Sequence, residues 1–132
     1  MEFKIKKFDI RSIDNDKVVV FIGKRDTGKS ILVKDLLFYN KNIPVGTVIS
    51  GTEGANSFYS KMMPSIFIHN DYKPEIVANV LKRQKGIISK IKTEVSERGD
   101  SNIDPRFFLI LDDCLYDKTW VNSKSIRRVF MN

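Results

Sequence analysis

Short apolar runs alternate along this chain with longer amphipathic segments. The runs rich in β-branched and aromatic residues predict strands at residues 17–22, 45–50, 66–69 and 107–111. Before them, the apolar positions of residues 3–13 change phase at Lys6 and Lys7, which predicts one bulged strand or two short strands. Turn residues at 13–17 could then form a hairpin into the next strand.

Between these strands, apolar residues recur at the intervals typical of a helix. This spacing predicts helical segments at about 28–39, at 58–63, from 74 to 95 and from near Ser123 onward. Pro64 should stop the second of these, and Pro74 suits the first turn of the third. Polar stretches at 51–56 and 97–102 predict loops. Alternating strands and helices predict an α/β fold, a doubly wound parallel sheet flanked by helices, with 107–111 buried on both faces.

Residues 23–30 fit the pattern G-x-x-x-x-G-K-[ST] between a predicted strand and a predicted helix, the setting of a phosphate-binding P-loop. Gly23 and Gly28 permit a tight turn whose N–H groups face phosphate oxygens, and Lys29 adds a positive charge. The Ser30 hydroxyl can ligate Mg²⁺. The predicted cofactors are ATP and Mg²⁺, and the predicted nucleotide-binding residues are Gly23, Lys24, Arg25, Asp26, Thr27, Gly28, Lys29, Ser30 and Ile31. The alternative is a glycine turn without a ligand.

Two acids, Asp112 and Asp113, end the apolar run at 107–111. Ligands of open α/β sheets bind at the carboxyl ends of the strands, so these acids are candidate site residues. We expect Asp112 to lie near the Mg²⁺ held by Ser30, as a metal-site residue. Asp113 is the predicted catalytic carboxylate, with Lys29, because a carboxylate near the γ-phosphate can orient or deprotonate water. The alternative for Asp113 is that it only caps the following turn.

Composition limits the class of protein. The 132 residues are 42% hydrophobic and 30% charged, which predicts a single globular domain over 1–132, with an N-terminal strand or hairpin at 1–16 and a nucleotide-binding core at 17–132. No apolar stretch is long enough to span a membrane, and the N-terminus lacks the apolar region of a signal peptide. The single cysteine, Cys114, excludes an internal disulfide and fits a reducing, intracellular setting.

The formal net charge of +7 suits a polyanionic partner, although a solvated basic surface gives the same number. The cations on the helix from residue 74 carry the same two interpretations. Arg127 and Arg128 could reach a neighbouring subunit's γ-phosphate or could be ordinary surface residues. We expect His69 to end a strand, Cys114 to be a small buried side chain and Trp120 to pack rather than stack on a base.

The two motifs together resemble the genome-packaging ATPases of nucleocytoplasmic large DNA viruses, within the FtsK–HerA division of P-loop ATPases. The resemblance covers about residues 8–132; beyond the motifs it rests on the segments 51–53 and 58–61, Pro64 and the basic helix. It implies an ASCE-type P-loop NTPase, a homo-oligomeric ring that hydrolyses ATP to drive double-stranded DNA into capsids. Capsid proteins would then be partners, and the setting would be the host cytoplasm at the site of virus assembly, or the virion.

The chain departs from that family in two respects. Many relatives in the wider superfamily have Glu where Asp113 stands, and Asp is shorter. Family members are also about twice as long and carry a sensor strand between the two motif strands. We therefore expect this chain to be truncated before the sensor strand, and the alternative is a short form whose sheet closes differently. The alternatives from other classes are a small nucleoside or nucleotide kinase, and a nucleotide-dependent binding module that does not hydrolyse ATP.

Overall fold

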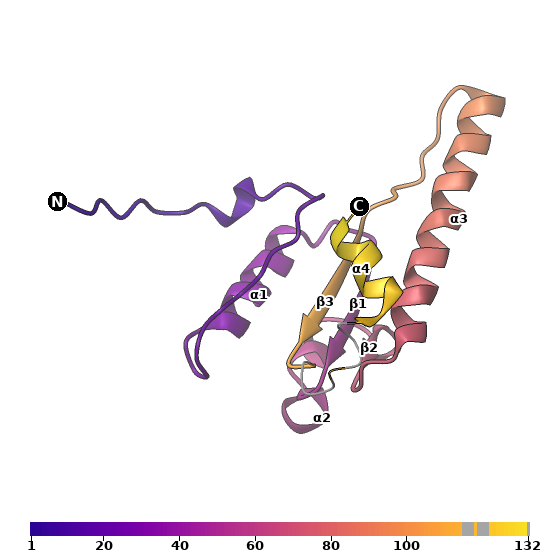
Figure 1. Cartoon of the computed structure of the whole chain (residues 1–132). Helices are drawn as coiled ribbons and strands as arrows, with labels where there is room; N and C mark the ends of the chain where they lie inside the picture. Colours follow the sequence, from indigo (N-terminus) through magenta and orange to yellow (C-terminus); the bar gives the residue numbers. More distant parts are fainter. Residues whose placement is uncertain (115–117, 119–121, 132) are drawn as a thin grey trace. The chain divides into compact units, whose positions relative to one another are not determined.

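The computed structural model describes residues 1–114, 118 and 122–131. The chain forms two compact units, residues 1–42 and 43–132, and each is described by itself. The second unit has a parallel three-stranded sheet with helices against it, which confirms the predicted α/β class and the parallel strands (Figure 1).

The sheet has the order β2-β1-β3. Its central strand is β1 (Val45–Ser50), with β2 (Ile68–His69) on one side and β3 (Phe107–Asp112) on the other. Gly46 faces Phe108 across the β1–β3 ladder, and a Cβ on Gly46 would clash with the Phe108 ring, so a larger residue there would require the ring to move.

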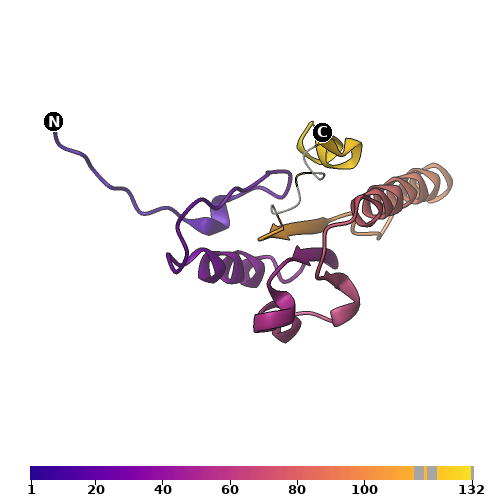
Figure 2. The ribbon, with the colours of Figure 1, turned by 60° about the horizontal axis from the view of Figure 1, so that its bottom comes forward.

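The core of the second unit lies between one face of the sheet and two helices, α3 (Pro74–Arg98) and α4 (Lys124–Met131). Figure 2 shows these helices near each other on the same side of β3. The buried residues of this core come from the sheet, the helices and the segments between them; they are Ile49, Tyr72, Val77, Cys114 and Ile126. Leu109 and Leu111 of β3 pack against this cluster.

Helix α3 forms as its sequence predicts. Pro74 occupies the first turn, where its missing N–H leaves no helical hydrogen bond unmade, and Glu75 lies beside it near the positive end of the helix dipole. The helix runs through Arg98 and ends at Gly99, whose φ of 79° is left-handed. The loop expected at 97–102 therefore begins two residues later. Within the described part of the chain, no helix has both the length and the apolar character needed to cross a membrane.

The first unit contains the predicted helix α1 (Lys29–Tyr39) and a 3₁₀ turn at Ile10–Ser12. The predictions of strands in 3–13 and 17–22 are wrong, because neither segment forms a strand. Residues 17–22 have the right composition, but no described strand pairs with them, and Ile22 remains 92% exposed. A segment with high strand propensity forms a strand only when a neighbouring strand supplies its hydrogen-bond partners.

Three smaller expectations need correction. The predicted loop at 51–56 contains a short helix, α2 (Glu53–Asn56), and the predicted strand at 66–69 is reduced to β2 because a 3₁₀ turn takes Ser65–Phe67. Strand β3 is half-buried rather than buried on both faces, since it lies at an edge of the sheet. The short helical turn before Pro64 is confirmed as the 3₁₀ turn Tyr59–Lys61.

Candidate functional site

In the first unit, the loop at residues 23–30 is held by its own side chains. The Lys29 ammonium donates to the carbonyl oxygens of Gly23 and Lys24, at 2.5 and 2.7 Å. The Thr27 hydroxyl donates to the Lys24 carbonyl at 2.6 Å. These contacts bring the lysine charge back over the loop, where an anion held by the loop would meet it.

The backbone of this loop needs glycine and tolerates aspartate at the bends. Gly28 has a φ of 88° and Asp26 a φ of 61°, both left-handed. A Cβ on Gly23 would lie 2.6 Å from the Thr27 hydroxyl oxygen, so a side chain there would clash. Left-handed residues next to right-handed ones turn successive N–H groups to one side and form a concave anion-binding surface.

Helix α1 starts directly from the loop, with Gly28 as its N-cap and no side chain bonded to its first turn. The first N–H groups of a helix have no partner within the helix, so those around Ser30 and Ile31 are available to a ligand. The helix dipole adds positive potential at the same place. Arg25 and Asp26 are exposed at the outer part of the loop. This unit therefore has the local features of a phosphate-binding site.

In the second unit, Asp112 lies at the carboxyl end of β3, opposite Ser50 at the end of β1. The Tyr59 hydroxyl donates to one carboxylate oxygen of Asp112, Oδ2, at 2.7 Å. Tyr59 is only 1% exposed, and burial, with the Asp112 charge, raises the pKa of its phenol well above the ordinary value. The phenol therefore stays protonated and acts as a fixed donor that orients the Asp112 carboxylate.

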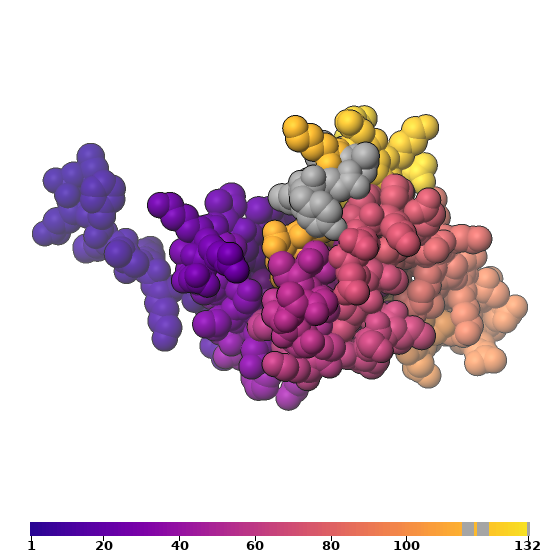
Figure 3. Space-filling model, turned by 90° about the horizontal axis from the view of Figure 1, so that it is seen from below, coloured from indigo at the N-terminus to yellow at the C-terminus, as the bar shows by residue number. Residues whose placement is uncertain are grey.

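Glu53 binds the backbone of Tyr59. Its carboxylate accepts from the backbone N–H of Tyr59 at 2.9 Å and from that of Ser60 at 2.8 Å. Burial alone would raise the pKa of Glu53, but these N–H donors outweigh it, and the pKa of this carboxyl lies below its ordinary value. Figure 3 shows the segment with α2 and Tyr59–Lys61 (magenta) at the surface of the carboxyl end of the sheet.

Asp113, next to Asp112, is exposed and has a left-handed φ of 48°. Aspartate adopts this conformation more readily than most residues, and such backbone positions occur often at functional sites and in turns. The observation therefore fits both the catalytic and the turn interpretation. Cys114, which follows, is 1% exposed, as expected, and burial raises the pKa of its thiol.

The loop at 23–30 belongs to the first unit, whereas Asp112 and Asp113 belong to the second. Among the described residues, no three His, Cys, Asp or Glu side chains are grouped to hold a metal. A magnesium nucleotide site does not need such a group, because Mg²⁺ usually takes one or two protein oxygens with phosphates and waters. The Ser30 hydroxyl and the Asp112 carboxylate are oxygen donors of this kind, one in each unit.

The sequence did not identify Glu53 and Tyr59 as site residues. Glu53 carried a weak signal, since an acid after a strand and a glycine turn is well placed for a sheet-end site. Tyr59 carried none, because it meets Asp112 across 53 positions of sequence. His69 ends β2, as expected, and Arg127 and Arg128 lie exposed on α4. Trp120 lies outside the described residues.

No protein-family model matches the chain, and no solved structure matches it. It is similar to viral proteins described as uncharacterized. A protein of Acanthamoeba polyphaga mimivirus is 37% identical over 99% of this chain and 46% of its own length. One of Invertebrate iridescent virus 6 is 40% identical over 99% of this chain and 51% of its own length. One of Frog virus 3 is 36% identical over 92% of this chain and 36% of its own length. The chain thus spans about half, or less, of these relatives.

Proposed function

We propose that this chain is the nucleotide-binding part of a P-loop ATPase that drives viral double-stranded DNA into capsids. The observation that carries the proposal is the loop at 23–30, where Lys29 is folded over the bends and helix α1 begins without a side-chain cap. Together these features provide the charge, the N–H groups and the dipole that bind a nucleotide's phosphates. The resemblance to packaging ATPases and the viral source of the relatives support the rest of the proposal.

Each part of the site has a chemical role in this proposal. Lys29 neutralises charge on the β- and γ-phosphates, and Ser30 with Asp112 would hold Mg²⁺, which adds charge stabilisation on the same oxygens when it is bound. Tyr59 fixes the orientation of Asp112. Asp113 positions the attacking water and accepts its proton. The proposed assembly is a homo-oligomeric ring with capsid proteins as partners, working at the site of virus assembly or in the virion.

The decisive test compares ATP binding by the parent chain with that of Lys29→Ala. We expect the variant to lose tight binding, by about 100-fold or more, because the loop loses the charge facing the phosphates. Lys34→Ala is the matched control, since Lys34 is an exposed lysine one turn further along α1. Unchanged affinity in Lys29→Ala would rule out the P-loop assignment.

Phosphate release with and without DNA then separates the alternatives. An ATPase motor releases phosphate to water and is stimulated by DNA. A kinase needs an acceptor for phosphoryl transfer, and a binding module retains ATP without turnover.

A further inference from the structure

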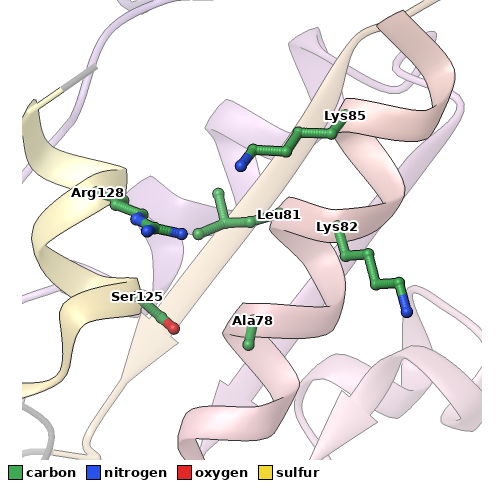
Figure 4. Close-up of a pocket in the computed structure, with 6 residues that line it drawn as sticks. All are labelled: Ala78, Leu81, Lys82, Lys85, Ser125 and Arg128. Atoms are coloured by element: carbon green, nitrogen blue, oxygen red, sulfur yellow. The ribbon is translucent and has the colours of Figure 1, made fainter. Parts of the chain in front are cut away.

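A hollow of about 160 Å³ lies between α3 and α4 in the second unit (Figure 4). The residues that line it are uncharged or cationic, and none is acidic; they are Ala78, Leu81, Lys82, Lys85, Ser125 and Arg128. Figure 4 shows Lys85 and Arg128 reaching toward each other across Leu81, while Lys82 points away from α4. An aliphatic side chain thus lies between two facing cations.

These cations have no carboxylate to neutralise them in the described part of the chain. The ion pairs found there are Arg11–Asp9, Lys17–Asp16 and Arg106–Asp104. Like charges that face each other repel, and they raise the positive potential of the hollow between them. An anion seated between Lys85 and Arg128 would convert this repulsion into attraction.

The positive surface continues along α3 beyond the hollow. Spacings of three and four residues place a row of small, hydroxyl and lysine side chains on one face of the helix; they are Ala78, Lys82, Lys85, Ser89, Lys92 and Ser96. The row contains no acid, and Lys92 lies two turns, about 10.5 Å, beyond Lys85. Repeated cations at such intervals suit a ligand with repeated negative charges better than a single small anion.

The chemistry of this surface favours a nucleic-acid duplex. Lysine, arginine and serine are common donors to phosphate oxygens, whereas proteins that bind single strands add aromatic side chains for base stacking. Neither the hollow nor the row on α3 includes an aromatic residue. We infer that the groove between α3 and α4, continued by the row on α3, binds the phosphate backbone of double-stranded DNA without selecting its sequence. The choice of DNA rests on the proposed function, while the preference for a polyanion follows from the charges.

The test measures binding of the 132-residue chain to a fluorescent 20-base-pair duplex by anisotropy, without nucleotide or Mg²⁺, over a range of salt concentrations. The groove variant is Lys85→Glu with Arg128→Glu. The control is Lys61→Glu with Lys90→Glu, which makes the same change in net charge at exposed lysines outside the groove. Circular dichroism checks that both variants keep their helices.

We expect the groove variant to bind the duplex about 10- to 100-fold more weakly, with a salt slope reduced by about two, and the control to lose only a few-fold. Equal losses in both variants, or equal competition by polyglutamate and unlabelled duplex, would overturn the inference. A chain that binds ATP but shows no groove-dependent DNA binding would refute this inference and leave the proposed nucleotide site intact. Groove-dependent DNA binding without ATP binding would refute the proposed ATPase and leave this inference standing.

Discussion

At the scale of single residues, Tyr59 is the clearest link between the loop after β1 and the end of β3. Its hydroxyl is buried and donates to Asp112 at 2.7 Å. Hydrogen bonds to charged acceptors contribute more to stability than neutral ones, and deleting the donor leaves a half-buried carboxylate oxygen unsatisfied. Tyr59 therefore stabilises the fold and orients Asp112 through the same contact.

We predict that Tyr59→Phe lowers the free energy of unfolding by about 1–3 kcal/mol, measured by urea denaturation. The matched control is Tyr72→Phe, because Tyr72 is also buried but its hydroxyl has no hydrogen-bond partner in the described part of the chain. Removing that hydroxyl should be neutral or stabilising. If the two variants lose equal stability, the Tyr59–Asp112 bond contributes nothing beyond packing.

A second prediction separates the two neighbouring acids. Asp113→Asn should keep the binding of Mg·ATP but reduce single-turnover hydrolysis by about 100-fold or more, since the amide keeps the shape and removes the proton acceptor. Asp112→Asn should instead weaken the Mg²⁺-dependent part of binding. The assays use a longer viral relative, at its aligned positions, because we expect this chain by itself to hydrolyse ATP poorly. Parental hydrolysis in Asp113→Asn would favour the turn interpretation of that residue.

The sequence indicated some site residues and not others for a physical reason. The P-loop pattern is a local motif in which glycines, a lysine and a serine act through nearby backbone, so eight consecutive residues are enough to predict it. Asp112 was found because an apolar strand leads directly to it. The hydrogen bond from Tyr59 to this carboxylate forms only when tertiary folding brings positions 59 and 112 together. The sequence pattern of neither segment predicts that contact.

At the scale of elements, the best-predicted segments have both a pattern and their own termination signals. Helix α3 has Pro74 at one end and Gly99 at the other, and β1 is a β-rich run between turn residues. The segment 17–22, wrongly predicted as a strand, also lies between turn residues, but no described strand pairs with it. A helix completes its hydrogen bonds within itself, whereas a strand depends on a neighbour, so the sequence of one segment cannot determine it.

The segment from α2 to the following 3₁₀ turn yields a pH prediction through Glu53. Its pKa is depressed in the folded chain, so its contribution to stability is complete above the ordinary value of about 4.5 and is lost as pH falls through the lower folded value. We predict that Glu53→Gln lowers the free energy of unfolding at pH 7 by about 1–3 kcal/mol and flattens its decline below pH 4.5.

The measurement is urea unfolding at a series of pH values. Glu97→Gln is the control, since Glu97 is an exposed carboxylate on α3. Glu97→Gln should leave nearly unchanged both the free energy of unfolding at pH 7 and its decline below pH 4.5. If the free energy of unfolding declines below pH 4.5 in the same way in Glu53→Gln and in the parent chain, groups other than Glu53 determine that decline.

At the scale of the whole molecule, the outer edge of β3 is the feature with the largest consequence. Among the described residues β3 pairs only with β1, which leaves one row of its backbone groups without a strand partner. Asp112 is the last residue of that edge strand, and Asp113 follows it. The residues that lead into the loop at 23–30, residues 17–22, are likewise outside any strand. In the packaging ATPases of our proposal, a sensor strand lies between the strand before the P-loop and the strand that ends in the acids.

We therefore predict that the 132-residue portion binds ATP but hydrolyses it poorly by itself. Binding uses the loop at 23–30, which is local, whereas hydrolysis needs Asp113 placed on the γ-phosphate, and an error of about 1 Å there can cost on the order of 100-fold in rate. The experiment uses the mimivirus relative at full length and cut to the portion that matches this chain, which is 46% of it. ATP affinity should be similar in the two forms, while single-turnover hydrolysis should be at least about 100-fold faster at full length. Equal hydrolysis rates would mean that the matched portion already forms a complete catalytic site and that the free edge of β3 does not limit it.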